Sequence, residues 1–264
     1  MTTPSAIVKV MSDAARKAGK TLSRDFGELS ELQVSRKGTA DFVSAADLRA
    51  EQLVREMLLR ARPGYGFIGE EGGRVEGSDR THTWIVDPLD GTTNFLHAMP
   101  HFAISIALER EGRIAAGVVH NPAANELFWA ERGRGAFLNE RRIRVAARTR
   151  FQDAVIATGI PFAGHGQPGL FLKELHQIMQ RTAGVRRFGS AALDLAWVAA
   201  GRFDGYWERD LSAWDLAAGV LLVREAGGIA TDADGGEDPI ATGSICAGNA
   251  EIQRGILELL RSAP

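Results

Sequence analysis

The chain has 264 residues, with 31 basic and 33 acidic side chains and a formal net charge of -2 at pH 7. A net charge so close to zero does not favour binding to nucleic acid or to a membrane surface, so such a partner would need a local charged patch. The single cysteine, Cys246, excludes an internal disulfide and a cysteine-rich zinc site, which fits a reducing compartment. The sequence shows neither a secretory signal pattern nor an apolar run of membrane-spanning length. We therefore expect a soluble cytoplasmic protein with no membrane partner.

Two amphipathic helices are predicted at the start of the chain. Apolar residues from Ile7 to Ala18 recur at the spacing of one helix face. A second such series runs from Ala50 to Leu58 and is closed by Ala61-Arg-Pro-Gly64. Between the two helices, residues 33–43 hold few apolar positions, and we expect a loop or short hairpin there.

The middle of the chain predicts an antiparallel meander. Short apolar or alternating runs, separated by turn residues, mark the strands at 67–68, 84–86, 102–108, 114–119 and 126–130, with one more hairpin at 133–145. Gly72 and the polar residues after it are expected to form a loop.

From residue 154 the pattern changes to strands and helices in alternation. Strands are predicted at 154–158, 185–188, 205–208 and 228–230, and helices at 170–179, 190–200 and 213–226; segments 244–247 and 252–260 close the chain. Sheets covered by helices in both halves indicate an α/β fold. We expect one domain over residues 1–264, with possible subdomains 1–150 and 151–264.

The stretch Trp84-Ile-Val-Asp-Pro-Leu-Asp-Gly-Thr-Thr-Asn-Phe95 places acids, glycine and hydroxyls at the end of an apolar run. Asp87 falls where the predicted strand stops, Pro88 removes the next backbone donor, and Gly91 allows a turn whose amides can face a ligand. A helix beginning at Thr92 would present free N–H groups that favour an anion. The pattern indicates a metal ion held between protein and phosphate, although Asp-Pro and Asp-Gly are also common turn formers.

Oxygen donors recur at predicted strand ends and helix starts, where Mg2+ could be held by carboxylates and a substrate phosphate. They are Glu70, Asp87, Asp90 and Asp215. Two such ions can activate a water and stabilise the leaving oxygen in one displacement. An alternative exists for two acids, because Ser44-Ala-Ala-Asp47 and Ser212-Ala-Trp-Asp215 fit the pattern of a helix N-terminus, in which the acid completes a cap.

Three segments in order resemble the inositol monophosphatase family, the Mg2+-dependent and lithium-sensitive phosphomonoesterases. They are Gly69-Glu-Glu71, Asp87-Pro-Leu-Asp-Gly-Thr-Thr-Asn-Phe95 and Trp214-Asp-Leu-Ala-Ala-Gly219. The resemblance implies a layered αβαβα sandwich of the inositol monophosphatase and fructose-1,6-bisphosphatase type, usually a homodimer. It also implies Li+ as an inhibitor.

By this resemblance, two to three Mg2+ ions are expected in the active site. Glu70, Asp87 and the carbonyl of Leu89 would bind the first ion, and Asp87, Asp90 and Asp215 the second. A third, weaker ion would lie near Glu70 through water, and Lys37 matches a family position beside it. Alone, a loop lysine such as Lys37 would be a solvated charge.

The resemblance also assigns catalytic roles. Glu70 and Thr92 would position and deprotonate the attacking water, while Asp47 would orient the Thr92 hydroxyl. Asp90 would also bind the substrate, and the amides of Gly91 and Thr92 would hold the phosphate. The alternative for Thr92 is a helix cap made by its hydroxyl.

The leaving alcohol would be recognised by a separate group of residues. The backbone at Gly189 and Ala191 resembles the family segment that faces the sugar-like ring, and Glu208 matches an acid that accepts an inositol hydroxyl. A carboxylate there suits a polyol and repels a second phosphate. Arg187 could contact an acidic substrate or a subunit, with a surface salt bridge as the alternative.

Residues 132–150 contain seven arginines. Such a run is usually the solvated face of a hairpin, and the other possibility is an RNA or protein contact. That possibility matters because the second half resembles the bacterial members, one of which also serves as a transcription antitermination factor. Most of the six histidines are expected to be ordinary loop or core residues. His97 and His101, four residues apart, are the best exception, but Pro100 between them disfavours a helical pair of metal ligands.

The sequence as a whole predicts a Mg2+-dependent phosphatase that hydrolyses myo-inositol 1-phosphate or a related sugar-like phosphate monoester by direct attack of water. One alternative keeps the chemistry and changes the ester, for example to histidinol phosphate or fructose 1,6-bisphosphate. The other is a partner-binding role in transcription.

Overall fold

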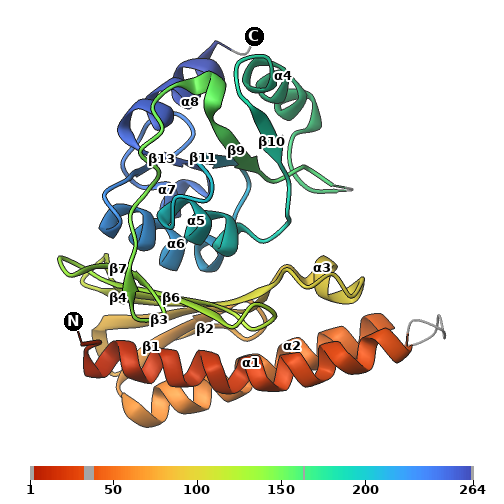
Figure 1. Ribbon diagram of the computed structural model, residues 1–264. Coiled ribbons are helices and arrows are strands. Elements are labelled where there is room, and N and C mark those ends of the chain that lie inside the picture. The colour runs from red at the N-terminus through yellow and green to blue at the C-terminus, as the bar shows by residue number, and fades with distance from the viewer. Residues whose placement is uncertain (1–2, 33–38, 163, 263–264) are drawn as a thin grey trace.

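The structure is a computed structural model that describes residues 3–32, 39–162 and 164–262. Five layers follow one another in Figure 1: a helix pair, a large sheet, two central helices, a smaller sheet, and an outer helix pair. This confirms the αβαβα arrangement. Within the described ranges, no helix is both long and apolar enough to cross a membrane.

The first layer consists of α1 (Ala6–Leu32) and α2 (Thr39–Ala61), which pack on the larger sheet. The predicted loop at 33–43 was wrong for its second part, because residues 39–43 are helical; residues 33–38 lie outside the described residues. The segment 39–61 contains four alanines before residue 51 and neither glycine nor proline, so nothing in it interrupts a helix. Asp47 therefore lies in a helix interior, and its predicted capping role was wrong.

The larger sheet has eight strands in the order β2-β1-β3-β4-β5-β6-β7-β8. Their bounds are β1 Tyr65–Gly69, β2 Gly73–Val75, β3 Asp79–Asp90, β4 Ala103–Arg110, β5 Arg113–Asn121, β6 Glu126–Glu131, β7 Gly135–Leu138 and β8 Arg141–Arg142. Only β1 and β3 are parallel; the other neighbours are antiparallel, as the meander predicts. Strand β2 was predicted as a loop because all its residues are exposed and give no apolar alternation.

The smaller sheet has the order β10-β9-β11-β13-β12. Its strands are β9 Val155–Thr158, β10 Gly184–Arg186, β11 Gly205–Glu208, β12 Ile229–Thr231 and β13 Ile245–Gly248. The helices of this half are α4 Pro168–Met179, α5 Ala191–Ala199, α6 Ala213–Glu225, α7 Pro239–Thr242 and α8 Ala250–Arg261, after a 3-10 turn at Phe151–Asp153. The short α7 was not predicted, and β10 ends before Arg187.

Small residues let the central helices lie close to each other and to the larger sheet. A Cβ atom at Gly219 of α6 would lie 2.6 Å from side-chain atoms of Leu195 in α5, and one at Gly117 of β5 would lie 3.0 Å from the Cα of Ala218. The hydroxyl of Ser105 in β4 donates to the carbonyl of Trp214 at 3.1 Å. These contacts fix the start of α6 against the sheet.

This packing predicts that Gly219→Ala destabilises the protein, although alanine favours a helix over glycine. Because the added methyl group overlaps Leu195, the free energy of unfolding should fall by about 1–3 kcal/mol, measured by urea denaturation. Gly169→Ala in α4 is the control, since no atom lies within 4 Å of the position that its Cβ would take, and it should leave stability unchanged or raise it by up to about 1 kcal/mol. Equal stabilisation by both changes would contradict this account of the packing.

Candidate active site

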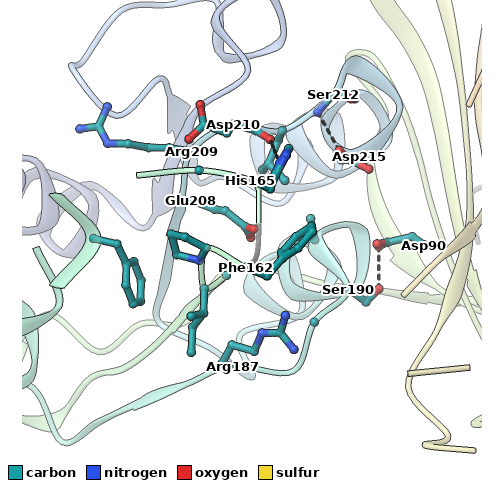
Figure 2. A pocket seen from close by; sticks show the side chains of 18 of the residues that line it. Asp90, Phe162, His165, Arg187, Ser190, Glu208, Arg209, Asp210, Ser212 and Asp215 are labelled. Atoms are coloured by element: carbon teal, nitrogen blue, oxygen red, sulfur yellow. Dashed lines mark hydrogen bonds between the residues drawn. The ribbon is translucent and has the colours of Figure 1, made fainter. Parts of the chain in front are cut away.

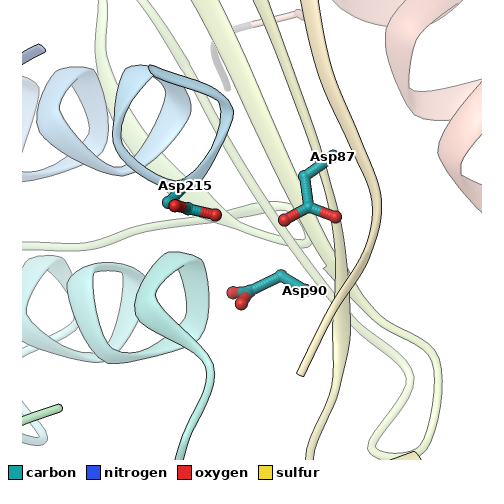
Figure 3. A group of neighbouring side chains, drawn as sticks. All are labelled: Asp87, Asp90 and Asp215. Carbon is teal, nitrogen blue, oxygen red and sulfur yellow. The ribbon is translucent and has the colours of Figure 1, made fainter. Parts of the chain in front are cut away.

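Three aspartates meet where β3 ends and α6 begins. Carboxylate oxygens of Asp87, Asp90 and Asp215 all lie within 4.8 Å of one another (Figure 3). Asp87 and Asp90 are only 2% and 8% exposed. The structure thus brings together residues separated by about half of the sequence.

The end of β3 presents its two aspartates through a break in the strand pairing. Asp87 pairs with Ser105 and Asp90 with Ala103, and the register shifts between them. Pro88, which lacks a backbone N–H, lies in this irregular part. The amide of Leu89 donates to Asp87 Oδ1 at 2.9 Å, so the carboxylate closes its own turn. The predicted interruption at Pro88 is therefore confirmed, although the strand continues to Asp90.

Asp215 is both a helix cap and a member of the acidic cluster. It is the third residue of α6, and its Oδ2 accepts the amide of Ser212 at 2.7 Å, while the Ser212 side chain bonds back to the helix in a capping box. The sequence offered capping and metal binding as alternatives. The structure shows that one carboxylate can cap the helix and face Asp87 and Asp90.

Glu70 joins this group from the turn between β1 and β2. It lines the same pocket as Asp90 and Asp215, and its negative charge contributes to the raised pKa of Asp87. Glu70 is an exposed residue, yet the protein packed around its carboxyl group, and next the charge of Asp215, raise its pKa to about 7. All four predicted oxygen donors therefore lie side by side.

The cluster is electrostatically costly without a positive charge in it. Burial, and then the charge of Asp215, raise the pKa of Asp90 to about 7. Burial, and then the charge of Asp90, raise the pKa of Asp87 well above its ordinary value. Burial, followed by Glu70, raises the pKa of Asp47 to about 8. A set of oxygen ligands whose negative charges repel one another fits a hard divalent cation.

The glycine turn beside the cluster leads into the short helix α3 (Thr92–Leu96). Gly91 has a φ of 93°, which a residue with a side chain rarely adopts. The Thr92 hydroxyl donates to the Leu89 carbonyl at 3.0 Å and makes no cap. Among the described residues, Asp47 Oδ1 is buried without a hydrogen-bond partner. The capping alternative for Thr92 was wrong, whereas its orientation by Asp47 stays a prediction.

A pocket of 370 Å3 opens beside the acids (Figure 2). Asp90, Ser190 and Asp215 lie at one side of the view, and Glu208 lies across from them. The predicted alcohol-side residues Gly189, Ala191, Arg187 and Glu208 all line the pocket. Their contacts with a substrate stay predictions.

Two of these residues have informative surroundings. Glu208 accepts a hydrogen bond from the hydroxyl of the fully buried Tyr206, and burial raises the pKa of Glu208 to about 7. Within the described parts of the chain, Arg187 forms no ion pair within 4.0 Å, so its salt-bridge alternative was wrong. Its positive charge still opposes the rise in the pKa of Glu208 and of Asp194 from a longer distance.

The sequence did not predict the roles of several residues at the site. Ser190 Oγ and the amide of Ala192, at the start of α5, donate to Asp90 Oδ2 at 2.6 and 2.7 Å. The buried Asn94 donates to the carbonyls of His101 and Phe188 at 2.8 and 2.7 Å and so ties the α3 loop to the loop before α5. A serine before a predicted helix is a recognisable cap signal, but its distant partner is not.

The histidines divide into core and pocket residues. His101 and His120 are largely buried, and burial lowers the pKa of each to about 4, so both rings are neutral near pH 7. His165 instead lines the pocket, where its ring stacks on Phe162 at 4.9 Å and its Nε2 contacts the Asp210 carbonyl at 2.9 Å. The prediction that most histidines are ordinary residues did not single out His165.

The arginine-rich segment is largely bonded to the protein itself. Arg148 pairs with Asp204, Arg150 with Asp153, and Arg134 with Glu131, while Arg132 donates to a backbone carbonyl. These contacts favour the structural interpretation of the segment, and its contact with RNA or protein stays a prediction. Lys37 lies outside the described residues.

Comparisons with known proteins agree with this architecture. A model of the inositol monophosphatase family matches residues 4–264. An inositol-1-monophosphatase of Caulobacter vibrioides is 62% identical over 256 residues, which are 96% of this chain and 100% of the relative. A Nus factor SuhB of Pseudomonas aeruginosa is 44% identical over 252 residues, 94% of this chain and 93% of the relative. The solved extragenic suppressor protein suhB of Bartonella henselae has a TM-score of 0.91 at 55% identity, covering 98% and 100% of the two chains.

The two packed sheets, their central helices and the buried carboxylates beside a glycine turn define a layered α/β phosphatase. Within that class, the chain belongs to the inositol monophosphatase family. It is an enzyme, and its acidic cluster is compatible with a bound metal.

The raised pKa values predict how pH affects the metal-free protein. Acids whose pKa rises from about 4 to about 7 or 8 on folding keep their protons in the native state after the unfolded chain has lost them. Their contribution to stability is therefore complete below about pH 4 and is lost as the pH rises towards 8. With excess EDTA, we expect Tm to fall by about 5 °C or more between pH 6 and pH 8.

Added Mg2+ should raise Tm more at pH 8 than at pH 6, because the cation replaces the protons that the carboxylates release. The measurement is thermal unfolding by circular dichroism at both pH values, with EDTA and with Mg2+. A Tm of the metal-free protein that rises over this range would contradict the proposed repulsion.

Proposed function

We propose that this protein is a Mg2+-dependent phosphatase that hydrolyses myo-inositol 1-phosphate and related sugar-like phosphate monoesters to the alcohol and inorganic phosphate. The observation that carries the proposal is the meeting of Glu70, Asp87, Asp90 and Asp215 beside the Gly91 turn in one pocket. Family membership and relatives named inositol-1-monophosphatase support the same reaction.

The four carboxylates would hold two Mg2+ ions, with the Leu89 carbonyl as a further ligand and a third, weaker ion near Glu70. Bound Mg2+ would supply an activated water and stabilise the charge of the leaving oxygen. Glu70 and Thr92 would direct the proton of the attacking water, and the amides of Gly91 and Thr92 would hold the phosphate oxygens. Li+ would inhibit by occupying the same oxygen ligands.

The opposite side of the pocket would select the alcohol. The Tyr206 hydroxyl fixes one oxygen of Glu208, so the carboxylate is oriented before a substrate arrives. Hydrogen bonding between Glu208 and a ring hydroxyl favours a polyol, while the backbone at Gly189 and Ala191 would face the ring and Arg187 would attract the anionic substrate. Beside a carboxylate, the second phosphate of fructose 1,6-bisphosphate is disfavoured.

The assembly and location of the protein are further proposals. The family resemblance implies a homodimer, which we propose for this chain, and exposed apolar side chains such as Phe162 leave apolar surface for such a contact. A solution mass of one chain would contradict this.

The packing of α5 and α6 on both sheets supports a single domain over 1–264; independent unfolding of 1–150 and 151–264 would argue against it. We also propose a cytoplasmic location, which fractionation tests.

A second function is favoured by one comparison. The relatives at 44% identity from Pseudomonas aeruginosa and Escherichia coli are named Nus factor SuhB. A contact with the transcription machinery is therefore a candidate role beside catalysis. A binding role should survive the loss of the acidic cluster, whereas turnover should not.

Asp87→Asn separates these two functions. Because the substitution removes a charged ligand that borders both proposed ions, turnover of inositol 1-phosphate should fall by about a thousandfold or more, with the fold retained by circular dichroism. Phosphate release with and without EDTA is the measurement, and Asp13→Asn on the exposed face of α1 is the control. Unchanged turnover of Asp87→Asn would refute the metal site.

Glu208→Gln tests the selection of the alcohol. Loss of a charged hydrogen-bond acceptor should raise KM for inositol 1-phosphate about tenfold or more. The KM for 4-nitrophenyl phosphate, which has no ring hydroxyls, should change less than about twofold. Steady-state kinetics on both esters checks this, and equal effects on the two KM values would remove Glu208 from substrate recognition.

A further inference from the structure

The turn that carries Glu70 has little support from the core. Glu70, Glu71, Gly72 and all residues of β2 are exposed, and β2 is the edge strand of the larger sheet. Glu70 must nevertheless be held close to Asp87 and Asp215, whose negative charges repel it. The β1–β2 pairing closes the turn at Gly69 and Gly73, and a further polar contact holds the residues between them.

That contact comes from Glu51 of α2. Its Oε2 accepts the amide of Glu71 at 2.9 Å, and its Oε1 accepts the amide of Gly72 at 2.7 Å. The Glu51 side chain is buried, with 5% of the residue exposed. One carboxylate thus binds the two consecutive amides that directly follow Glu70, a charge-assisted arrangement that is stronger than ordinary hydrogen bonding.

Two glycines make room for this carboxylate. A Cβ atom at Gly69 would lie 2.4 Å from Glu51 Oε2, and one at Gly72 would lie 2.5 Å from Oε1. The Gly69-Glu-Glu-Gly72 segment therefore wraps around the end of the Glu51 side chain. This explains the glycines that flank the acids, which the ligand chemistry alone does not require.

We propose that Glu51 is a positioning residue for the acidic cluster: by binding the amides of Glu71 and Gly72, it holds Glu70 where a cation can be shared with Asp87. This inference rests on the proposed metal-dependent function. It also accounts for the presence of a buried acid beside the cluster. Both oxygens are occupied by backbone donors, and the remaining charge adds to the negative potential that attracts the cation.

The alternative is that Glu51 only stabilises the fold. Asp25 provides a matched comparison, because it is equally buried at 1% exposure and is held by Arg24 and Arg49, away from the pocket. Loss of either carboxylate should lower Tm. Only loss of Glu51 should alter the Glu70 turn.

The test compares Glu51→Gln with Asp25→Asn. Glutamine puts an NH2 group opposite one of the two amides, so one hydrogen bond is replaced by two facing donors. For Glu51→Gln, the Mg2+ concentration at half-maximal activity should rise about tenfold, while kcat at saturating Mg2+ stays within about twofold. Amide exchange at Glu71 and Gly72 should accelerate in metal-free protein. Asp25→Asn should show neither effect.

Gly72→Ala is the second variant, since its methyl group would overlap Glu51 Oε1 while every carboxylate remains. It should raise the Mg2+ requirement in the same direction. Unchanged exchange at residues 71–72 in Glu51→Gln, or a Mg2+ requirement equal to that of Asp25→Asn, would overturn the proposal. Amide exchange in metal-free protein does not depend on turnover. If the wild-type protein had no phosphatase activity, the proposed function would be wrong, and the exchange rates would still decide whether Glu51 holds the turn.

Discussion

The repulsion among four neighbouring carboxylates is the constraint on which the rest of this structure depends. Three of these acids, Asp87, Asp90 and Asp215, accept hydrogen bonds from backbone N–H groups at a turn or a helix start. Asp87 accepts the amide of Leu89, Asp215 caps α6, and Asp90 accepts the amide of Ala192 in the first turn of α5. The helix dipoles of α5 and α6 add partial positive charge at the same place. The site therefore draws its stability from helix and strand ends that converge.

That convergence explains why the fold needs a helix layer between two sheets. Helices α5 and α6 both start at the pocket, and their buried faces pack on the larger sheet and on each other through alanines and glycines. Large side chains there would move α6 away from β3 and separate Asp215 from Asp87. The small residues of the motif after Asp215 thus serve the chemistry indirectly, because they set the distance between helix and sheet.

The sequence predicted features that depend on local patterns and missed those that depend on distant partners. Strand and helix order followed from periodicity, and Pro88 marked the break in β3. The Ser-x-x-Asp pattern was correct for Asp215 but wrong for Asp47, since the same pattern can occur inside a longer helix. Nothing local identifies Glu51 as the partner of the Glu70 turn, 20 residues away, or Ser190 as a partner of Asp90.

The two sides of the pocket use their acids differently. On the proposed metal side several carboxylates share one volume, so their negative charges must be offset by protons or by a cation. Glu208 stands apart and is fixed by a single phenol, and burial raises its pKa to about 7. Near neutral pH such a group can accept a hydrogen bond as a carboxylate or donate one as an acid. A sugar hydroxyl can form a hydrogen bond with either form of Glu208. A second phosphate can form one only with the protonated acid, which acts as the donor. In the proposed function, acidic side chains thus hold a metal at one side of the pocket and select an alcohol at the other.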